Sequence, residues 1–174
     1  MAKLPIVLAP DPVLKAKAKS IAAVDDSIRR LMDDMLETMY AAPGIGLAAN
    51  QVGVLKRVLV LDVAREGDAP KPMGMANPEV VWASPEQSVY NEGCLSLPEQ
   101  YADITRPAAV RVRYLDRDNK QQEIEADGLL ATCIQHEIDH LDGVLFVDHL
   151  SALKRNMIMK KLLKLKKQRA EDGE

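Results

Sequence analysis

A central run of short strand-like segments, uninterrupted by any helix, most constrains the fold of this sequence. Between residues 54 and 126, β-branched or alternating apolar segments follow one another with turn residues between them. Parallel strands need long crossover connections, usually helices, so this arrangement predicts antiparallel sheets. The expected strands cover residues 54–63, 74–83, 88–98, 108–115 and 120–126, with a hairpin turn at 116–119.

Helical periodicity lies on both sides of this run. Residues 25–42 form an amphipathic pattern that Asp25 or Asp26 can cap. Residues 129–141 are apolar on most sides, which predicts a central, buried helix, and residues 151–169 form a basic amphipathic helix. We therefore expect an α+β domain without internal repeats, in which antiparallel sheets pack around the central helix. One domain is expected over residues 1–150, with the basic helix and tail, 151–174, packed on it.

Composition excludes several classes of protein. The chain has 174 residues and a formal net charge of -3, which argues against a domain that binds nucleic acid over its whole surface. No apolar run approaches the roughly 20 residues of a membrane span, and the N-terminus lacks the pattern of a secretory signal. Only two cysteines occur, so a disulfide framework is not expected. We predict a cytoplasmic protein.

The segment His136-Glu-Ile-Asp-His140 lies within the expected central helix. Residues four apart project from one helical face, so His136 and His140 can chelate one metal ion, and Glu137 is placed to take a proton from water. The third metal ligand of two familiar protease families is missing. Phe146 stands where a metzincin has its third histidine, and the downstream glutamate of a thermolysin-like protease is absent, because no glutamate occurs between residues 137 and 171. His149 remains a possible third ligand.

The two cysteines are the other candidates for the third ligand. Cys133 is one turn before His136, but a metal shared by the two histidines should lie roughly 7 Å further along the helix axis. Its side chain also leans away, towards the N-terminus of the helix, so a small buried core residue is the favoured interpretation. Cys94, in a strand-like segment after Gly93, can reach the helix only through the tertiary fold. Spacing alone leaves this choice open.

Three motifs together resemble those of the peptide deformylase family. They are Gly44-Ile-Gly-Leu-Ala-Ala-Asn-Gln51, Glu92-Gly-Cys-Leu-Ser96 and Gln135-His-Glu-Ile-Asp-His140, in this order. The resemblance covers almost the whole chain, and the basic C-terminal helix is similar to that of the Gram-negative bacterial form.

The resemblance implies a metal-dependent hydrolase that removes the N-formyl group from N-formylmethionyl nascent peptides and releases formate. Cys94, His136 and His140 would be the metal ligands. One divalent ion is implied, Fe²⁺ as the usual metal, with Zn²⁺, Ni²⁺ or Co²⁺ as substitutes, although Cys and His ligands alone would suggest zinc.

The resemblance also assigns roles around the metal. Glu137 would transfer protons, while the side-chain amide of Gln51 and the backbone N–H of Leu95 would stabilise the oxyanion. Without the resemblance, Gln51 and Gly46 would be interpreted as ordinary loop residues. Gly46 would pair with the peptide backbone as an added strand does. The implied methionine pocket and its surroundings comprise Ile45, Tyr90, Glu92, Leu129, Thr132, Cys133 and His136.

Some positions depart from the family pattern. Tyr90 and Thr132 are polar where the family often has aliphatic residues, and Tyr101 replaces an arginine that is frequent in the closest form. The resemblance further implies an ion pair between Glu92 and Arg106 that holds the cysteine loop.

The basic C-terminal helix has two interpretations. It is either a solvated helix docked on the domain, or a surface that contacts the ribosome near the tunnel exit, as the resemblance implies. A monomer is expected. The alternatives to an active deformylase are an endopeptidase with His149 as third ligand and a catalytically silent, ribosome-associated module.

Overall fold

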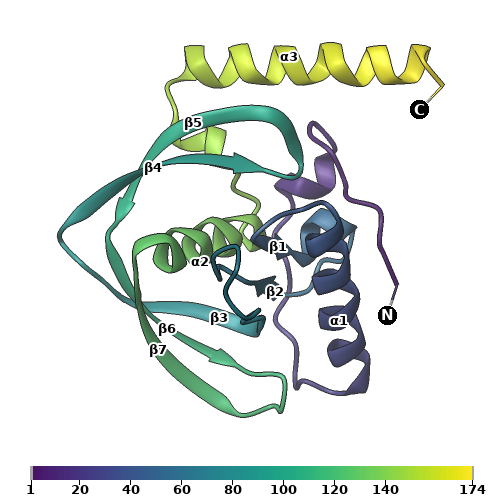
Figure 1. The fold of residues 1–174 in the computed structure, drawn as a ribbon. Helices are drawn as coiled ribbons and strands as arrows, with labels where there is room; N and C mark the ends of the chain where they lie inside the picture. Colours follow the sequence, from purple (N-terminus) through teal and green to yellow (C-terminus); the bar gives the residue numbers. More distant parts are fainter. Residues whose placement is uncertain (1, 174) are drawn as a thin grey trace.

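A computed structural model describes residues 2–173 and shows an α+β fold, as the sequence predicts. The predicted helices and strands follow in the expected order, but the short strand at Gly46–Ala48 was not predicted (Figure 1). The α-helices are α1 (Asp26–Ala41), α2 (Gly128–Leu141) and α3 (Ala152–Glu171). The strands are β1 (Gly46–Ala48), β2 (Val58–Leu61), β3 (Met73–Ala83), β4 (Gln87–Cys94), β5 (Leu97–Pro107), β6 (Ala109–Leu115) and β7 (Gln121–Asp127), and the 3₁₀ helices are η1 (Pro12–Lys15), η2 (Ala49–Val52) and η3 (Phe146–His149).

The strands form two antiparallel sheets, which confirms the prediction from the connections. One sheet has five strands in the order β1-β2-β3-β6-β7, and the other is the pair β4-β5. The predicted strand over 88–98 is wrong in detail, because it contains nearly all of β4, a tight turn and the start of β5. The rest of β5 was not predicted. The inward positions of β5 include the polar Gln100 and Arg106, so the strand shows little apolar alternation in the sequence.

Helix α2 lies between the two sheets, with β4 and β5 on one side and β3, β6 and β7 on the other (Figure 1). Nine of its fourteen residues are buried, from Ala131 to Leu141. This surrounded position explains why the sequence is apolar on most sides of the helix, as predicted. It also places the polar motif residues of α2 in an environment with little access to water.

Helix α1 covers the β1–β2 end of the larger sheet. Asp25 caps it by accepting a hydrogen bond from the backbone N–H of Ile28, and Met32, Met35 and Met39 lie completely buried against β1 and β2. The loop after α1 leads directly into β1, so the packing of α1 fixes where the Gly44–Gln51 motif begins.

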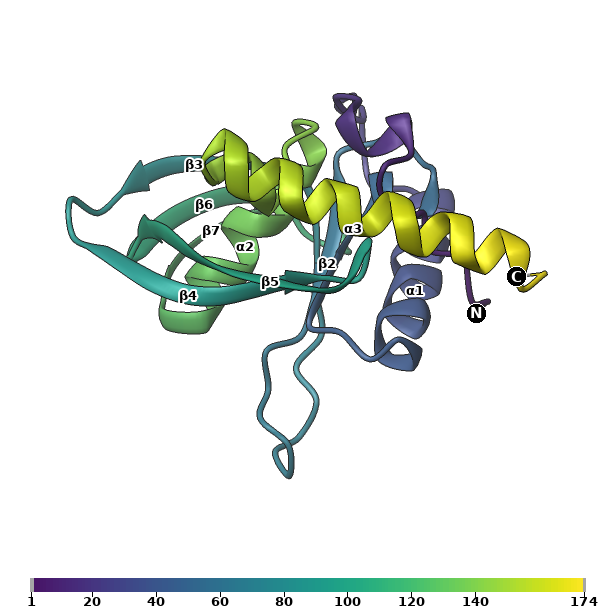
Figure 2. The same ribbon diagram turned by 90° about the horizontal axis from the view of Figure 1, so that it is seen from above.

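Helix α3 crosses over the β4–β5 hairpin (Figures 1 and 2). Leu162 is its only buried residue among those described, packed with residues of η1 and η3. The expected apolar side is therefore only partly covered, because Leu153 and Met157 on it are exposed. Within residues 2–173, no helix combines the length and apolar character needed to cross a bilayer.

Candidate metal centre and active site

Three side chains from two elements converge beneath the smaller sheet. The Nε2 atom of His140 lies 3.2 Å from both the Nε2 atom of His136 and the Sγ atom of Cys94. Across residues 2–173, this is the single group of three or more histidine, cysteine or carboxylate side chains close enough to hold one ion, with ligand atoms within 4.8 Å of one another. Two imidazoles and a thiolate form a donor set that suits a divalent transition metal.

The local structure explains this convergence. His136 and His140 lie one helical turn apart on α2, and Cys94 ends β4 at a register shift between Gly93 and Cys94. Gly93 leaves room there for the ring of Tyr101, which lies only 2.4 Å from where a Cβ would be. The irregularity turns the Cys94 side chain towards α2.

The polar surroundings of the histidines fit metal ligation. The Nδ1 atom of His136 contacts Glu92 at 2.9 Å, which leaves Nε2 directed at the shared point. Burial lowers the pKa of His140 well below its usual value, and the neighbouring His136 and Arg106 lower it further. His140 is therefore held neutral, the form of imidazole that binds metals.

Glu137 lies beside this group without belonging to it. It is buried, and its Oε1 atom has no hydrogen-bond partner among the described residues. Burial raises the pKa of Glu137 to about 7. A carboxylate with a pKa in this range is suited to accept and return protons near neutral pH.

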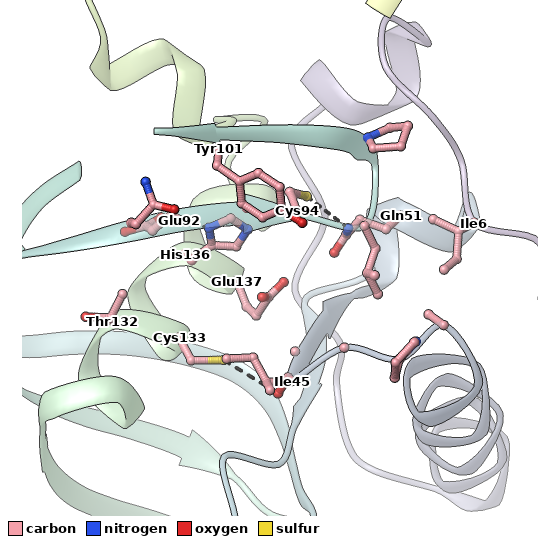
Figure 3. A pocket seen from close by; sticks show the side chains of 18 of the residues that line it. Ile6, Ile45, Gln51, Glu92, Cys94, Tyr101, Thr132, Cys133, His136 and Glu137 are labelled. Carbon is pink, nitrogen blue, oxygen red and sulfur yellow. Dashed lines mark hydrogen bonds and ion pairs between the residues drawn. The ribbon is translucent and has the colours of Figure 1, made fainter. Parts of the chain in front are cut away.

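The amide of Gln51 has a fixed orientation. Its Oε1 atom accepts a hydrogen bond from the backbone N–H of Ala48 at 2.9 Å, so the NH₂ group points the other way. That group lies 3.0 Å from the Oγ atom of Ser96. It also contacts the Sγ atom of Cys94, at 3.4 Å (Figure 3). A donor is thereby held beside the cysteine, next to the position of Leu95.

A cleft of about 710 Å³ opens over these residues (Figure 3). It is lined from both sides, by α2 and by the segments around β1 and the β4–β5 turn. Sequence reasoning did not identify Ile6, Leu8, Pro98 or Arg169, which also line it and carry no motif. The residues expected to bind substrate all line this one cleft: Ile45, Gly46, Tyr90, Glu92, Leu129, Thr132 and Cys133.

Comparison with known proteins identifies the family. The family model of polypeptide deformylase matches residues 3–156. The chain belongs to this family. It is 58% identical over 165 residues to a peptide deformylase of Rhizobium meliloti (strain 1021), and this match covers 95% of each chain. It is 60% identical over 171 residues to a peptide deformylase of Methylocella silvestris, and that match covers 97% of this chain and 87% of the relative.

Solved deformylase structures share the fold. The crystal structure of peptide deformylase from Ehrlichia chaffeensis superposes with a TM-score of 0.92 at 42% identity, over 97% of this chain and 99% of that chain. A structure of peptide deformylase from the same organism in complex with actinonin gives a TM-score of 0.90 at 45% identity, over 94% of this chain and 98% of that chain.

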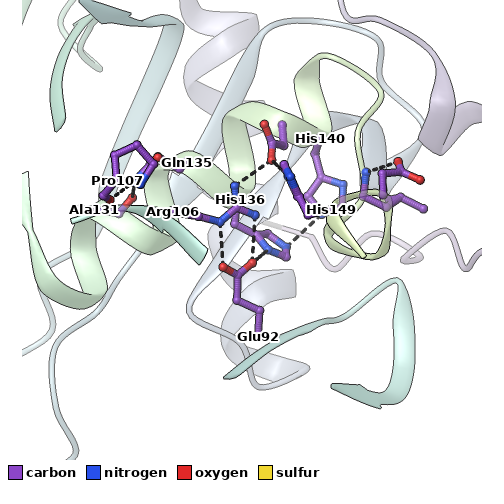
Figure 4. A network of polar contacts seen from close by, with 11 residues as sticks. Glu92, Arg106, Pro107, Ala131, Gln135, His136, His140 and His149 are labelled. Carbon is purple, nitrogen blue, oxygen red and sulfur yellow. Dashed lines mark hydrogen bonds and ion pairs between the residues drawn. The ribbon is translucent and has the colours of Figure 1, made fainter. Parts of the chain in front are cut away.

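In this deformylase, a buried ionic network supports the histidines (Figure 4). Arg106 donates two hydrogen bonds to Glu92, at 2.7 and 3.0 Å, and one to Asp139 at 2.8 Å. Burial by itself would raise the pKa of Glu92, but hydrogen bonds from His136 and Arg106 outweigh it and lower that pKa. The ion pair expected between Glu92 and Arg106 is confirmed, whereas the part played by Asp139 was not foreseen.

Cys133 and His149, the other two candidates for the third metal ligand, lie outside the ligand group. The Sγ atom of Cys133 faces the carbonyl oxygen of Ile45 at 3.7 Å, and the thiol lines the cleft outside the ligand group, as helix geometry predicted. The Nε2 atom of His149 lies 2.8 Å from Asp139. The alternative in which His149 completes the metal site is therefore wrong for this structure.

Proposed function

We propose that Cys94, His136 and His140 hold one divalent metal ion, and that this centre performs the deformylase reaction of the family. The enzyme removes the formyl group from the N-terminal formylmethionine of newly synthesised peptides and releases formate. The observation that carries the assignment is the meeting of Cys94 with the two histidines at 3.2 Å, beside a buried carboxylate with a free oxygen.

The chain supplies the proton transfers through Glu137. A divalent ion in this site supplies Lewis acidity that makes water a competent nucleophile near neutral pH. Glu137 accepts the proton of the attacking water at its carboxylate and later delivers a proton to the departing amine. Its burial raises its pKa to about 7, so both directions of transfer are accessible.

Two donors stabilise the negative charge that develops on the formyl oxygen. They are the Nε2–H of Gln51, which is oriented by its bond to Ala48, and the backbone N–H of Leu95. Each donor of this kind is worth about 10²–10³ in rate. Because the protein fixes these groups before the substrate arrives, no reorganisation is needed during the reaction.

The peptide binds along β1. This strand is at the edge of the larger sheet, paired on one side with β2, and Gly46 lines the cleft on the other side. An extended peptide can therefore add as a further strand, with the methionine side chain in the apolar part of the cleft. That part is formed by Ile45, Tyr90, Leu129, Thr132 and Cys133. Glu92, His136 and Tyr101, the last in place of an arginine, also line the cleft.

Further assignments follow from the family resemblance. We propose Fe²⁺ as the metal, with Zn²⁺, Ni²⁺ or Co²⁺ as substitutes, in a monomeric, cytoplasmic enzyme whose catalytic domain is residues 1–150. Helix α3 presents Lys160, Lys161, Lys164 and Lys167 on an exposed face for contact with the ribosome near the tunnel exit. Such binding should weaken steeply with salt, and salt-independent cosedimentation of α3 with ribosomes would contradict it.

Formate release from a formyl-Met peptide tests the function directly. The anaerobically purified, iron-loaded protein should release formate, and Glu137→Ala should lower the rate by about 10²–10⁴ while retaining the metal, because Glu137 is outside the ligand group. No release by the unmodified protein would refute the proposed function.

A further inference from the structure

His149 is the one histidine that the proposed mechanism does not use. It ends η3, the short helix between α2 and α3, and its side chain is 39% exposed. We propose that His149 is a positioning residue for the metal ligand His136 and acts through Asp139, Arg106 and Glu92. This inference rests on the proposed function, because it assumes that His136 binds the metal.

A continuous series of short polar contacts connects the two histidines (Figure 4). From His149 Nε2 to the Oδ2 atom of Asp139 the distance is 2.8 Å, and the same oxygen accepts a bond from Arg106 Nη1 at 2.8 Å. Arg106 then holds both oxygens of Glu92, and Glu92 Oε1 lies 2.9 Å from His136 Nδ1. Every contact in the series is within ordinary hydrogen-bond distance.

The side chains become more exposed from Glu92 and Arg106 to Asp139 and His149, so water can compete for the outer contacts. Arg106 and Glu92 are almost fully buried, whereas the Asp139 side chain is 24% exposed. An ionised carboxylate only accepts hydrogen bonds, so His149 must donate from Nε2. This donor competes with water for Asp139 and keeps its oxygen on Arg106. Without it, Asp139 is free to turn to solvent, and one donor of the buried guanidinium loses its fixed partner.

The position of Arg106 determines the position of Glu92. Two parallel bonds fix the Glu92 carboxylate in the plane of the guanidinium, and that carboxylate orients the His136 ring. Outer partners of this kind typically change metal affinity 10- to 100-fold. His149 is three contacts further out than Glu92, so an effect at the lower end of this range is expected.

Helix η3 also contacts His136 directly, through Phe146. The ring of Phe146 stacks on that of His136 with centroids 6.3 Å apart. A substitution at His149 that merely displaced η3 would therefore disturb the ligand without any role for the polar series. Lys15 provides a matched control, because it forms an ion pair with Asp148 on the same helix and does not contact Asp139.

The test is zinc retention by zinc-loaded protein in competition with a chromogenic chelator. His149→Phe keeps a ring but has no donor, and it should weaken zinc binding roughly tenfold, the lower end of the range for outer partners. His149→Gln restores a donor and should recover most of the affinity, and Lys15→Gln should match the unmodified protein. Equal zinc affinity in all four proteins would overturn the inference. His149→Ala, with the unfolding temperature of each metal-free protein, replaces His149→Phe if that variant does not fold.

A double substitution tests the route. In a Glu92→Ala background, the additional His149→Phe change should alter zinc affinity less than about twofold, because no side chain at position 92 then connects Arg106 to His136. The same tenfold loss in both backgrounds would refute action through Glu92. Failure of the unmodified protein to release formate would refute the proposed function instead, so the two failures are distinguishable.

Discussion

Gly46 leaves Glu137 the space that its carboxylate occupies. A Cβ at this position would lie 2.6 Å from Glu137 Oε2 and 2.8 Å from Cys133 Sγ. The sequence offered Gly46 as an ordinary turn residue or, by resemblance, as a partner for the peptide backbone. The structure adds a close approach between β1 and α2, in which a larger residue would displace the Glu137 carboxylate.

Gly46→Ala should therefore impair the reaction more than the fold. The added methyl group must displace the Glu137 carboxylate, and misplacement of a reacting group by about 1 Å can cost around 10²-fold in rate. We expect kcat for formate release to fall about 10- to 100-fold. Gly67→Ala is the control, because Gly67 has φ +89° and open space around it. It should cost about 1 kcal/mol of stability and leave kcat unchanged; an equal kcat in both variants would contradict this account.

At the scale of elements, one hydrogen bond fastens the end of α1 to the sheet. The hydroxyl of Tyr40 donates to Asp62, just after β2, at 2.5 Å. Burial raises the pKa of Asp62, but bonds from Tyr40 and the backbone N–H groups of Ala64 and Lys71 outweigh it and lower that pKa. Burial and the Asp62 contact raise the pKa of Tyr40 to about 12.

The loss of stability on removal of this hydrogen bond should depend on pH. The native protein holds the Tyr40 proton more tightly than the unfolded chain, so the stabilisation is complete below pH 10 and is lost as pH rises to about 12. Tyr40→Phe should lower the free energy of unfolding by about 1 kcal/mol near neutral pH, a modest value because Tyr40 is 46% exposed. Urea unfolding of both proteins over this range is the measurement. A difference that does not shrink above pH 10 would show that the hydrogen bond is not its cause.

Helix α3 offers a second test at this scale. Leu162 is 2% exposed and packs on the domain, whereas its neighbour Leu163 is 54% exposed. Leu162→Ala should lower the free energy of unfolding by about 2–5 kcal/mol, and Leu163→Ala should change it by less than about 0.5 kcal/mol. Equal effects, measured by urea unfolding, would mean that α3 does not dock on the domain as we propose.

At the scale of the whole molecule, the proposed metal ligands join two layers. Cys94 comes from the two-stranded sheet, and His136 and His140 come from the helix beneath it. An ion bound here would therefore act as a tertiary crosslink, and its binding free energy would add to the stability of the native state.

Metal removal should thus lower the unfolding temperature. With zinc at a hundredfold excess over Kd, the stabilisation should be about 2.7 kcal/mol, and a chelator should abolish it. Cys94→Ser should make the unfolding temperature insensitive to the chelator. Cys133→Ser should keep the response, because Cys133 lies outside the ligand group. A loss of the response in Cys133→Ser alone would reverse the assignment of the two cysteines.

The sequence predicted the local elements where side-chain periodicity reflects burial. Helices α1 and α2 and the β6–β7 hairpin lie close to the expected residues, because their apolar positions repeat with the period of the structure. Strand β5 was recognised only at its start. Burial alternates along this strand, but its inward side includes Gln100 and Arg106, so the apolar residues do not repeat with the period of a strand.

The sequence by itself determined the α+β class, the helical face that carries His136 and His140, and the exclusion of Cys133 by helix geometry. All three depend on contacts or distances within one element. Only the tertiary structure decided that Cys94 meets that face and that His149 contacts Asp139 instead. These contacts bridge 46 and 10 residues of sequence, and they exist because α2 is enclosed between two sheets and η3 folds back over it. The spacing of residues along the chain does not predict such packing.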